Sequence, residues 1–469
     1  MSDGVDRERL ALEAETMRAL GYRVVDRLVE RWAGLASAPI PTQERRAAVV
    51  ERLAEALPKE GRDPVAVLDR AVDAVLAASA PTGHPRFFGF IPSPSNFVAV
   101  LADALAAGFN PFLGNFMEAP GPHVLEEVTL GWLRDACGLP EGAGGLFTSG
   151  GSMANLTGLA AARELCGPGR VYVSSQTHGS VAKAVRLLGL AEPVVLPVDE
   201  RFQLRLDALE QALSADAGRS RMAVVATAGT TNTGAVDPLE GIAELCAREG
   251  VWLHVDGAYG GAAAFGARSR VRVAGLERAD SLSLDPHKWL FTPYECGCVL
   301  VRDRRHLRAA FDARADYLSD VRGDDESLDF QDLGFQLTRS FRALKVWATF
   351  QVFGADAIAA AIERGVANAE HMGRWLSARD GWAVAAPPSL GVVAFRFTAG
   401  QAEEGLDALN AGLVRRLEAT GRAFVSSTVL GGRRWLRACP ISPRTTRADL
   451  EETLEILDRL AREAGPQPM

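Results

Sequence analysis

The sequence predicts an α/β fold with a mostly parallel central sheet and a small α+β domain at the C-terminal end. One observation behind this prediction is that short apolar runs alternate with helical stretches between residues 86 and 345, as in consecutive βαβ units. Another is that several runs are apolar throughout, as expected of strands covered on both faces. The expected strands are Val171–Ser175, Met222–Thr227, Val251–Val255, Ser281–Leu284 and Gly297–Val301.

The first segment of the chain is predicted to be a helical arm. Apolar residues recur there at spacings of three, four or seven, and up to about residue 85 there is no convincing strand. One amphipathic helix does not stay folded alone, so this apolar stripe must pack on another surface. The stripe consists of Leu10, Met17, Leu20, Val24, Leu28 and Trp32.

The last segment is predicted to be the small α+β domain. Gly391–Phe397 and Arg434–Ala438 are typical of strands, and Arg447–Glu463 is an amphipathic helix that Thr446 and Asp449 can cap. The chain is too long for one ordinary core, so we expect more than one packed unit. The expected units are an N-terminal arm over 1–85, a large domain over 86–350 and a small domain over 351–469.

Composition and charge argue against several functions. The 469 residues carry 51 basic and 59 acidic side chains, a net charge of −8, which opposes binding to nucleic acid or to an anionic membrane. No apolar run is long enough for a membrane helix, and the N-terminal residues are too charged for a secretory signal. The six cysteines form no CxxC pair and no zinc-binding pattern, so we expect no metal and a reducing, cytoplasmic environment.

A lysine after one of the expected strands is the strongest candidate for chemistry. Ligands of parallel sheets bind beyond the carboxyl ends of the strands, where Lys288 stands in the run Asp285-Pro-His-Lys-Trp289. Burial would depress the pKa of the Lys288 amine and leave it nucleophilic, as a Schiff base requires. The alternative is a surface lysine after a turn, and the neighbouring motifs weigh against it.

An acidic residue ends the preceding expected strand. Asp256 follows Val251–Val255, where a carboxylate needs a cationic partner because burying it alone is costly. A protonated pyridine nitrogen is such a partner, and enzymes that use pyridoxal 5′-phosphate (PLP) place an acidic residue there, which makes the ring an electron sink. A helix N-cap or an ion pair with an arginine is an equally good interpretation of Asp256 alone. The spacing to Lys288 leaves room for one helix, so both residues can face one pocket.

Gly150, Gly151 and Ser152 are candidates for binding a phosphate. They precede a predicted helix over Leu156–Leu165. Free backbone N–H groups and the helix dipole attract an anion at such a helix start. Gly/Ser turns are common, however, and the run lacks the lysine of a nucleotide-binding P-loop, so the motif has little weight alone.

Two further polar residues follow strand ends. His178 could stack on a pyridine ring near the reacting carbon, although a lone histidine is more often structural. Thr227 could contact the ring, or it is an ordinary β-branched strand residue. The phosphate loop, His178, Thr227, Asp256 and Lys288 thus each lie at a strand end. Their joint occurrence is far more specific than any single motif.

With these motifs the sequence resembles the group II PLP-dependent amino-acid decarboxylases, a family that includes aromatic amino-acid decarboxylases. The resemblance covers about residues 84–447 and is most specific in His254-Val-Asp-Gly-Ala-Tyr259 and Asp285–Trp289. It implies the fold-type-I architecture of aspartate aminotransferase, PLP as the cofactor, and a homodimer with interleaved N-terminal arms and shared active sites.

The resemblance also implies roles for single residues. Lys288 would form the Schiff base, Asp256 would pair with the pyridinium and His178 would stack on the ring. Thr227 and Ala258 would lie against the ring, and the glycine-serine run and His287 would surround the phosphate. The positions expected to contact the cofactor are Gly150, Gly151, Ser152, His178, Thr227, Asp256, Ala258, His287 and Lys288.

The substrate side of the site is implied by two segments. The run from His84 to Ser93 resembles the segment that lines the family's substrate, although core packing explains Phe87 and Phe88 equally well. Phe90 replaces a tyrosine of the aromatic decarboxylases, and Asn115–Glu118 is more polar than in those enzymes, which leaves the substrate open. The expected pocket residues are Phe90, Ile91, Pro92, Ser93 and Asn115.

The acidic stretch from Asp312 to Asp332 resembles the family's mobile catalytic loop, which reaches the partner subunit's active site. Tyr317 matches the loop tyrosine that completes decarboxylation, and the alternative for the stretch is a solvated surface loop. The implied catalytic set is Lys288, His178, Asp256 and Tyr317.

The resemblance implies decarboxylation of an L-amino acid, with an aromatic side chain preferred, to the amine and CO₂. Tyr317 or His178 would return the proton to Cα. The alternatives are another PLP reaction, such as that of an oxygen-dependent aldehyde synthase, and a non-catalytic binding protein with the same fold. The presence of Tyr317 favours simple decarboxylation, and the intact set of His178, Asp256 and Lys288 argues against a binding protein.

Overall fold

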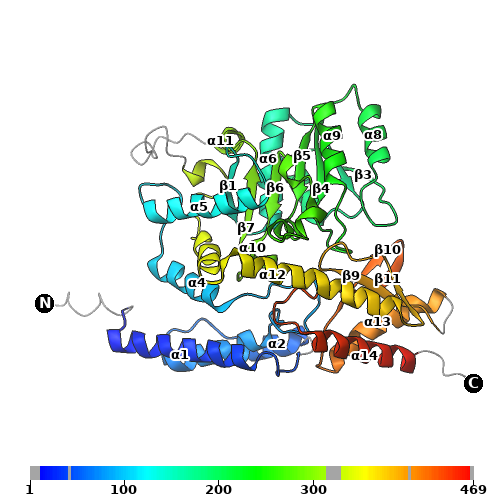
Figure 1. The fold of residues 1–469 in the computed structure, drawn as a ribbon. Coiled ribbons are helices and arrows are strands. Elements are labelled where there is room, and N and C mark those ends of the chain that lie inside the picture. The colour runs from blue at the N-terminus through cyan, green and yellow to red at the C-terminus, as the bar shows by residue number, and fades with distance from the viewer. Residues whose placement is uncertain (1–10, 41–43, 313–328, 400–402, 465–469) are drawn as a thin grey trace, which may run out of the picture.

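The computed structural model describes residues 11–40, 44–312, 329–399 and 403–464 (Figure 1). Its centre is a seven-stranded sheet in the order β1-β7-β6-β5-β4-β2-β3. β7 runs antiparallel to both of its neighbours, β1 and β6, and the other pairs are parallel, which confirms the mostly parallel sheet. The strands are β1 Gly144–Thr148, β2 Arg170–Ser174, β3 Val194–Leu196, β4 Arg221–Thr227, β5 Trp252–Asp256, β6 Ser281–Leu284 and β7 Gly297–Val301.

Helices separate these strands along the chain and pack on the sheet. α6 lies across β4, β5, β6 and β7, so its first turn faces the strand ends where chemistry was expected. Residues of β4 to β7 are buried almost without exception, because helices shield the sheet from water. The helices of this unit are α4 Phe97–Phe109, α5 Pro120–Ala136, α6 Gly151–Cys166, α7 Gly179–Leu187, α8 Leu206–Ala215, α9 Leu239–Glu249, α10 Pro286–Trp289 and α11 Arg305–Phe311.

A long helix, α12 (Ala343–Ser377), crosses the middle of the molecule and joins two hydrophobic cores (Figure 1). The part of α12 up to Val366 packs into the core of the seven-stranded sheet through residues such as Val346 and Ile362, and Met372 near its end packs into the second core. The helix breaks at Gly354, where φ is 75° and ψ is 157°, a conformation that glycine adopts without steric cost. The boundary expected between residues 350 and 351 falls inside α12, and that division into domains stays a prediction.

The second core lies under a four-stranded antiparallel sheet in the order β10-β11-β9-β8. The helix cap expected before α14 is confirmed: the Thr446 hydroxyl donates to an Asp449 carboxylate oxygen at 2.6 Å, and the Asp449 backbone N–H donates to Thr446 Oγ1 at 3.2 Å. The elements are β8 Trp382–Val384, β9 Val393–Phe397, α13 Glu403–Ala419, β10 Ser426–Leu430, β11 Arg433–Ala438 and α14 Arg447–Ala464.

The N-terminal arm runs below α12 in Figure 1 and is helical as expected. Its helices are α1 Ala14–Gly34, α2 Arg46–Leu53 and α3 Pro64–Arg70, and the last continues in irregular turns to Ala78. No residue of α1 is buried, although Trp32 packs edge-on against Phe97 of α4 at 5.5 Å. Of the predicted stripe, Met17 is 55% exposed, and Leu10 lies outside the described residues. Val24 is also exposed, whereas Leu20, Leu28 and Trp32 are half-buried, so the stripe is only partly covered in a single chain.

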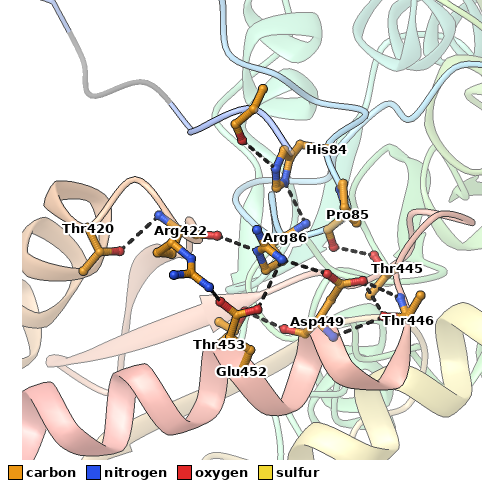
Figure 2. Close-up of polar contacts among 11 residues, drawn as sticks. His84, Pro85, Arg86, Thr420, Arg422, Thr445, Thr446, Asp449, Glu452 and Thr453 are labelled. Atoms are coloured by element: carbon orange, nitrogen blue, oxygen red, sulfur yellow. Dashed lines mark hydrogen bonds and ion pairs between the residues drawn. The ribbon is translucent and has the colours of Figure 1, made fainter. Parts of the chain in front are cut away.

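A polar junction follows the arm and ties it to the C-terminal unit (Figure 2). The Arg86 guanidinium lies 3.1 Å from Asp449 and 3.2 Å from Glu452 of α14, and its Nε donates to the Arg422 carbonyl at 2.7 Å. Two residues earlier in the chain, the His84 ring forms a hydrogen bond with the Ala38 carbonyl at 3.2 Å. The start of the segment that was expected to line the substrate is thus fixed between the arm and α14.

Candidate active site

The carboxyl ends of β4, β5 and β6 border a cavity of about 340 Å³. All nine positions that the sequence predicted for cofactor contact line it, although they come from five separate stretches of the chain. They are Gly150, Gly151, Ser152, His178, Thr227, Asp256, Ala258, His287 and Lys288. The structure therefore brings the predicted cofactor residues together in one place.

Lys288 sits in the short helix α10, which begins directly after β6 with Asp285 at its N-cap position. The Lys288 amine is half-buried and lies 3.0 Å from the Asp285 carboxylate. Burial lowers the pKa of this amine, but the carboxylates of Asp285 and Asp256 outweigh burial and raise that pKa above its usual value. The expected depression of the pKa is therefore wrong for the free lysine, which is an ammonium ion with a proton acceptor beside it.

Asp256 ends β5 and points its carboxylate into the cavity. One oxygen accepts a hydrogen bond from Asn155 Nδ2 at 2.9 Å, and the other accepts from the Ala258 backbone N–H at 3.1 Å and from Ser283 Oγ at 3.3 Å. Within the described ranges no basic side chain lies in ion-pair distance of Asp256, so the alternative of an arginine partner is not found there. A buried carboxylate with only neutral donors suits a cation in the cavity.

The predicted phosphate loop forms the start of α6. Ser149, Gly150, Gly151 and Ser152 line the cavity, and the helix begins at Gly151, so its first amide groups and its dipole face an anion site. The loop packs closely, because a Cβ atom at Gly151 would lie only 2.8 Å from the Cβ of Ala258.

His287, beside Lys288, packs against the Tyr294 ring at 5.0 Å. Burial lowers the pKa of His287 despite the nearby Asp285 carboxylate. The imidazole is therefore neutral at neutral pH.

His178 and Thr227 approach the cavity from neighbouring strands. His178 is the N-cap of α7, and its Nδ1 accepts a hydrogen bond from the Ser180 backbone N–H at 3.2 Å. The Thr227 hydroxyl is buried and has no hydrogen-bond partner in the part of the chain that the structure describes. An unsatisfied buried hydroxyl at a cavity wall is a place where a ligand completes the hydrogen bonding.

The expected substrate residues lie elsewhere. None of Phe90, Ile91, Pro92, Ser93 and Asn115 lines the cavity of the single chain. Phe90 is 62% exposed with a φ of 54°, and Phe87 and Phe88 are core residues, which decides between the two interpretations of those rings. Tyr317 lies outside the described residues.

The polar members of that expected pocket have structural partners instead. Ser93 is buried and donates a hydrogen bond to the His287 carbonyl, so it supports the turn that carries Lys288. Asn115 is buried and donates to the Glu118 carboxylate at 2.6 Å. Neither side chain is presented to the cavity in the single chain.

The sequence pattern did not reveal several polar residues that line the cavity, among them Asn155, Asp285 and Glu295. Asp285 stands one helical turn before Lys288, so its spacing was a usable signal. Asn155 is 101 positions from Asp256 in the chain, and Glu295 pairs with Arg342 at 2.6 Å. Such partners cannot be recognised before the fold is known.

Together these groups fit PLP. The cavity offers an amine for the aldehyde, a carboxylate without a cation, an unsatisfied hydroxyl and a helix start for the phosphate. The α/β fold and this site define a PLP-dependent enzyme.

The family model of the pyridoxal-dependent decarboxylase conserved domain matches residues 47–398. The chain belongs to this family, is a PLP-dependent amino-acid decarboxylase, and uses PLP as its cofactor.

Known relatives cover almost the whole chain. An aromatic-L-amino-acid decarboxylase of Bacillus atrophaeus is 38% identical over 98% of both chains. An L-2,4-diaminobutyrate decarboxylase of Rhizobium meliloti (strain 1021) is 36% identical over 87% of this chain and 84% of the relative. A solved structure of Oryza sativa TDC with PLP and tryptamine superposes with a TM-score of 0.91 at 29% identity, covering 97% of this chain and 99% of the other. These matches confirm the fold class and the reaction type.

No helix within the described ranges is long and apolar enough to cross a membrane. The same ranges contain no group of three or more His, Cys, Asp or Glu side chains that could hold a metal ion.

Proposed function

We propose that the substrate is an aromatic L-amino acid, which the enzyme converts to the amine and CO₂. The observation that carries this proposal is the 38% identity, over 98% of both chains, to an aromatic-L-amino-acid decarboxylase. The diaminobutyrate decarboxylase is nearly as similar, at 36%, so the charges of the cavity must distinguish the two substrate classes.

The carboxylates of the cavity favour an aromatic over a diamino substrate. A second ammonium group on the substrate needs an unpaired carboxylate in the pocket. Three acidic residues line the cavity: Asp256 faces the cofactor, Asp285 pairs with Lys288, and Glu295 pairs with Arg342 at 2.6 Å. Among the described residues the cavity thus offers no carboxylate for a second ammonium.

The proposed roles of the individual residues follow from the positions of their side chains. Bound PLP supplies the electron sink for the electrons that remain when CO₂ departs. Lys288 would hold the cofactor through its amine, and Asp285, 3.0 Å away, is placed to accept the proton of the ammonium. Asp256 would pair with the protonated pyridine nitrogen, and His178 would stand beside the ring. The Lys288 amine would also be placed to move protons.

We further propose that Tyr317 donates the proton to Cα, as the family resemblance implies. A tyrosine hydroxyl is a competent general acid when a loop holds it near the substrate and excludes water.

A homodimer is part of the proposal. Exposed apolar side chains on a stable monomer are usually scattered, and a continuous set marks an interface. Here α1 has no buried residue, and the neighbouring α4 exposes Leu105 by 56% and Phe109 by 84%. A second copy of the chain would cover these helices.

A reducing, cytoplasmic location is also proposed. All six cysteines are free thiols, and five of them are buried. Burial raises the pKa of Cys137 and of Cys439 to about 12, so these thiols are inert core residues.

A product assay tests the proposed substrate. The purified holoenzyme is incubated separately with tryptophan, tyrosine, phenylalanine, glutamate and 2,4-diaminobutyrate, and the amines are quantified by mass spectrometry. We expect the highest kcat/KM with an aromatic amino acid. A higher kcat/KM with 2,4-diaminobutyrate would contradict the proposal, and Glu295→Gln would then show which carboxylate binds the second ammonium.

A further inference from the structure

A chain of buried hydrogen bonds runs behind the cofactor cavity and has Asn155 at its centre. Asn155 Nδ2 donates to Asp256 at 2.9 Å and to Ser180 Oγ at 3.0 Å, and Asn155 Oδ1 contacts His254 Nε2 at 3.0 Å. Beyond His254 the chain continues to Ser281 and Trp252, and beyond Ser180 it ends at His178. The remaining links are His254 Nδ1 to Ser281 Oγ at 2.8 Å, Trp252 Nε1 to Ser281 Oγ at 2.8 Å, and Ser180 Oγ to His178 Nδ1 at 2.8 Å.

The Asn155 amide fixes the direction of the inner part of this hydrogen-bond chain. Asn155 Nδ2 gives its hydrogens to Asp256 and Ser180, and Asn155 Oδ1 can only accept, so His254 donates a proton from Nε2. A neutral ring with its proton on Nε2 accepts at Nδ1 from the Ser281 hydroxyl, whose oxygen accepts from the Trp252 indole N–H. Burial lowers the pKa of His254 to about 4, which keeps this ring neutral with one proton.

The outer end requires the same direction independently. His178 Nδ1 receives the backbone N–H of Ser180 at 3.2 Å, so this nitrogen carries no proton and also accepts from the Ser180 hydroxyl. The Ser180 oxygen is then free to accept from Asn155 Nδ2. A carboxylate can only accept, so Asp256 requires the second Asn155 hydrogen.

The packing around this hydrogen-bond chain permits one arrangement of its side chains. Asn155 and Ser281 are 1% exposed, Ser180 is 4% exposed and His254 is fully buried, so no water substitutes for a lost partner. Gly158, one turn after Asn155 on α6, provides the space for the His254 ring, because a Cβ atom at Gly158 would lie 2.9 Å from that ring. His178 lines the cavity, and no described group forms a hydrogen bond with its Nε2.

We propose that Asn155 is a positioning residue for the reaction, because its two amide hydrogens orient Asp256 and, through Ser180, His178 in one connected hydrogen-bond chain. The inference rests on the cofactor site proposed above. Both residues that contact the ring from this side then depend on one amide that itself does not react. A substitution at Asn155 is expected to disturb both of them together, whereas a substitution at a single link disturbs one.

The first test is the position of the protons in the unsubstituted enzyme. ¹⁵N NMR of the holoenzyme labelled at its seven histidines, recorded above the usual pKa of histidine, reports the tautomer of each ring. We expect neutral rings with the proton on Nε2 for both His178 and His254. A proton on Nδ1 of either ring would overturn the proposed direction.

The second test compares Asn155→Ala with a matched control, Asn410→Ala. Asn410 is also a fully buried amide that uses both ends, with Phe397 and Leu406, but it lies in the C-terminal unit. Asn155→Ala should shift the signals of both histidines and raise the Kd for PLP about tenfold or more, because a hydrogen bond to a charged group is lost. Asn410→Ala should lower stability while its histidine signals and its PLP affinity stay at wild-type values.

Ser180→Ala provides a milder variant if Asn155→Ala does not fold. It removes the link to His178 but keeps the backbone N–H, so it should move the His178 signal and leave that of His254. Wild-type PLP affinity in Asn155→Ala, or equal shifts in Asn410→Ala, would overturn the role of Asn155. Trapping of PLP by borohydride on a lysine other than Lys288 would instead overturn the cofactor site, so the two failures are distinguishable.

Discussion

The carboxyl edge of the seven-stranded sheet and the N-terminal arm differ in how far a single chain buries their side chains. At the sheet edge, Asn155 and His254 are buried and have partners at every polar atom. In the arm, α1 buries no residue, and Met17 is 55% exposed. One chain therefore builds the cofactor half of the site, whereas the arm and the expected substrate residues need a further surface.

At the carboxyl edge of the sheet, loss of Lys288 is expected to have the largest effect. Lys288→Ala should abolish turnover and the lysine-linked chromophore, because no other amine of the described residues lines the cavity. The chain has only four lysines, Lys59, Lys183, Lys288 and Lys345, so peptide mapping after borohydride reduction is unambiguous. The exposed Lys183 serves as control, since Lys183→Ala should keep the chromophore. PLP found on any of the other three lysines would refute the assignment.

Asp256→Asn comes next in size. The amide keeps the shape of the side chain but removes the charge that holds the pyridinium proton, so we expect a rate lower by several orders of magnitude and weaker retention of PLP. Ser283→Ala is the matched control, because it removes only one hydrogen bond to Asp256, at 3.3 Å, and leaves the carboxylate in place. Rates and PLP affinities are measured for both variants at saturating cofactor. A near-normal kcat for Asp256→Asn would exclude this role.

The carboxyl edge of the sheet is also the part of the molecule that the sequence predicts well. Lys288, Asp256 and His178 each follow an apolar strand, and the ends of parallel strands meet at one edge, so strand order alone brings them together. Asn155 could not be predicted in this way, because its contact with Asp256 depends on how α6 crosses the sheet. The raised pKa of Lys288 was missed for the same reason, since it depends on where two carboxylates point.

The residues of the expected substrate pocket were predicted less well from the sequence. Ser93 lies in the segment that resembles the family's substrate-lining run, yet here it supports the turn that carries Lys288. The short strands β1 and β3 were also missed, because three to five residues at a sheet edge carry little hydrophobic pattern. Local pattern thus identifies long buried elements, and side-chain direction requires the tertiary structure.

Deletion of the arm tests whether the partly covered apolar stripe of α1 is an interface. Removing residues 1–35 should give aggregation or loss of activity, because it exposes the surface that the stripe covers. Met17→Glu is a sharper variant and should weaken the dimer in light scattering. Val271→Glu, at a residue that is 75% exposed on the large unit, should leave the mass unchanged. A stable, active monomer after deletion would contradict the proposed dimer.

Tyr317→Phe is expected to change the products more than substrate binding. Phenylalanine keeps the ring but removes the proton donor, so oxygen can react before the proton returns to Cα. Amine, aldehyde and peroxide are assayed together in air, and KM should change little because the hydroxyl acts after binding. If amine still forms at the wild-type rate, Tyr317 is not the acid and His178 becomes the better candidate.

The smallest expected effect is a pH dependence of stability that originates at Asp237, just behind Thr227. Asp237 accepts hydrogen bonds from the Leu204 and Thr227 backbone N–H groups, both at 2.7 Å, and forms no ion pair with any described residue. Burial raises the pKa of Asp237 to about 6, above the value of an unfolded aspartate. A raised folded pKa means that this group stabilises the fold below pH ~4 and that the contribution is lost as the pH rises through about 6.

The loss should amount to about 3 kcal/mol between those limits, since one pKa unit corresponds to ~1.4 kcal/mol. Asp237→Asn removes the ionisation but keeps one acceptor, so the difference in unfolding free energy between wild type and variant should change with pH by this amount. Urea unfolding of the PLP-saturated proteins across the range measures it. Asp356→Asn, at an exposed carboxylate of α12 with no ion pair to a described residue, is the control and should show little change. A pH-independent difference for Asp237→Asn would mean that the carboxylate is already ionised throughout, held by its two backbone donors, and that the cofactor edge tolerates a buried charge without a cation.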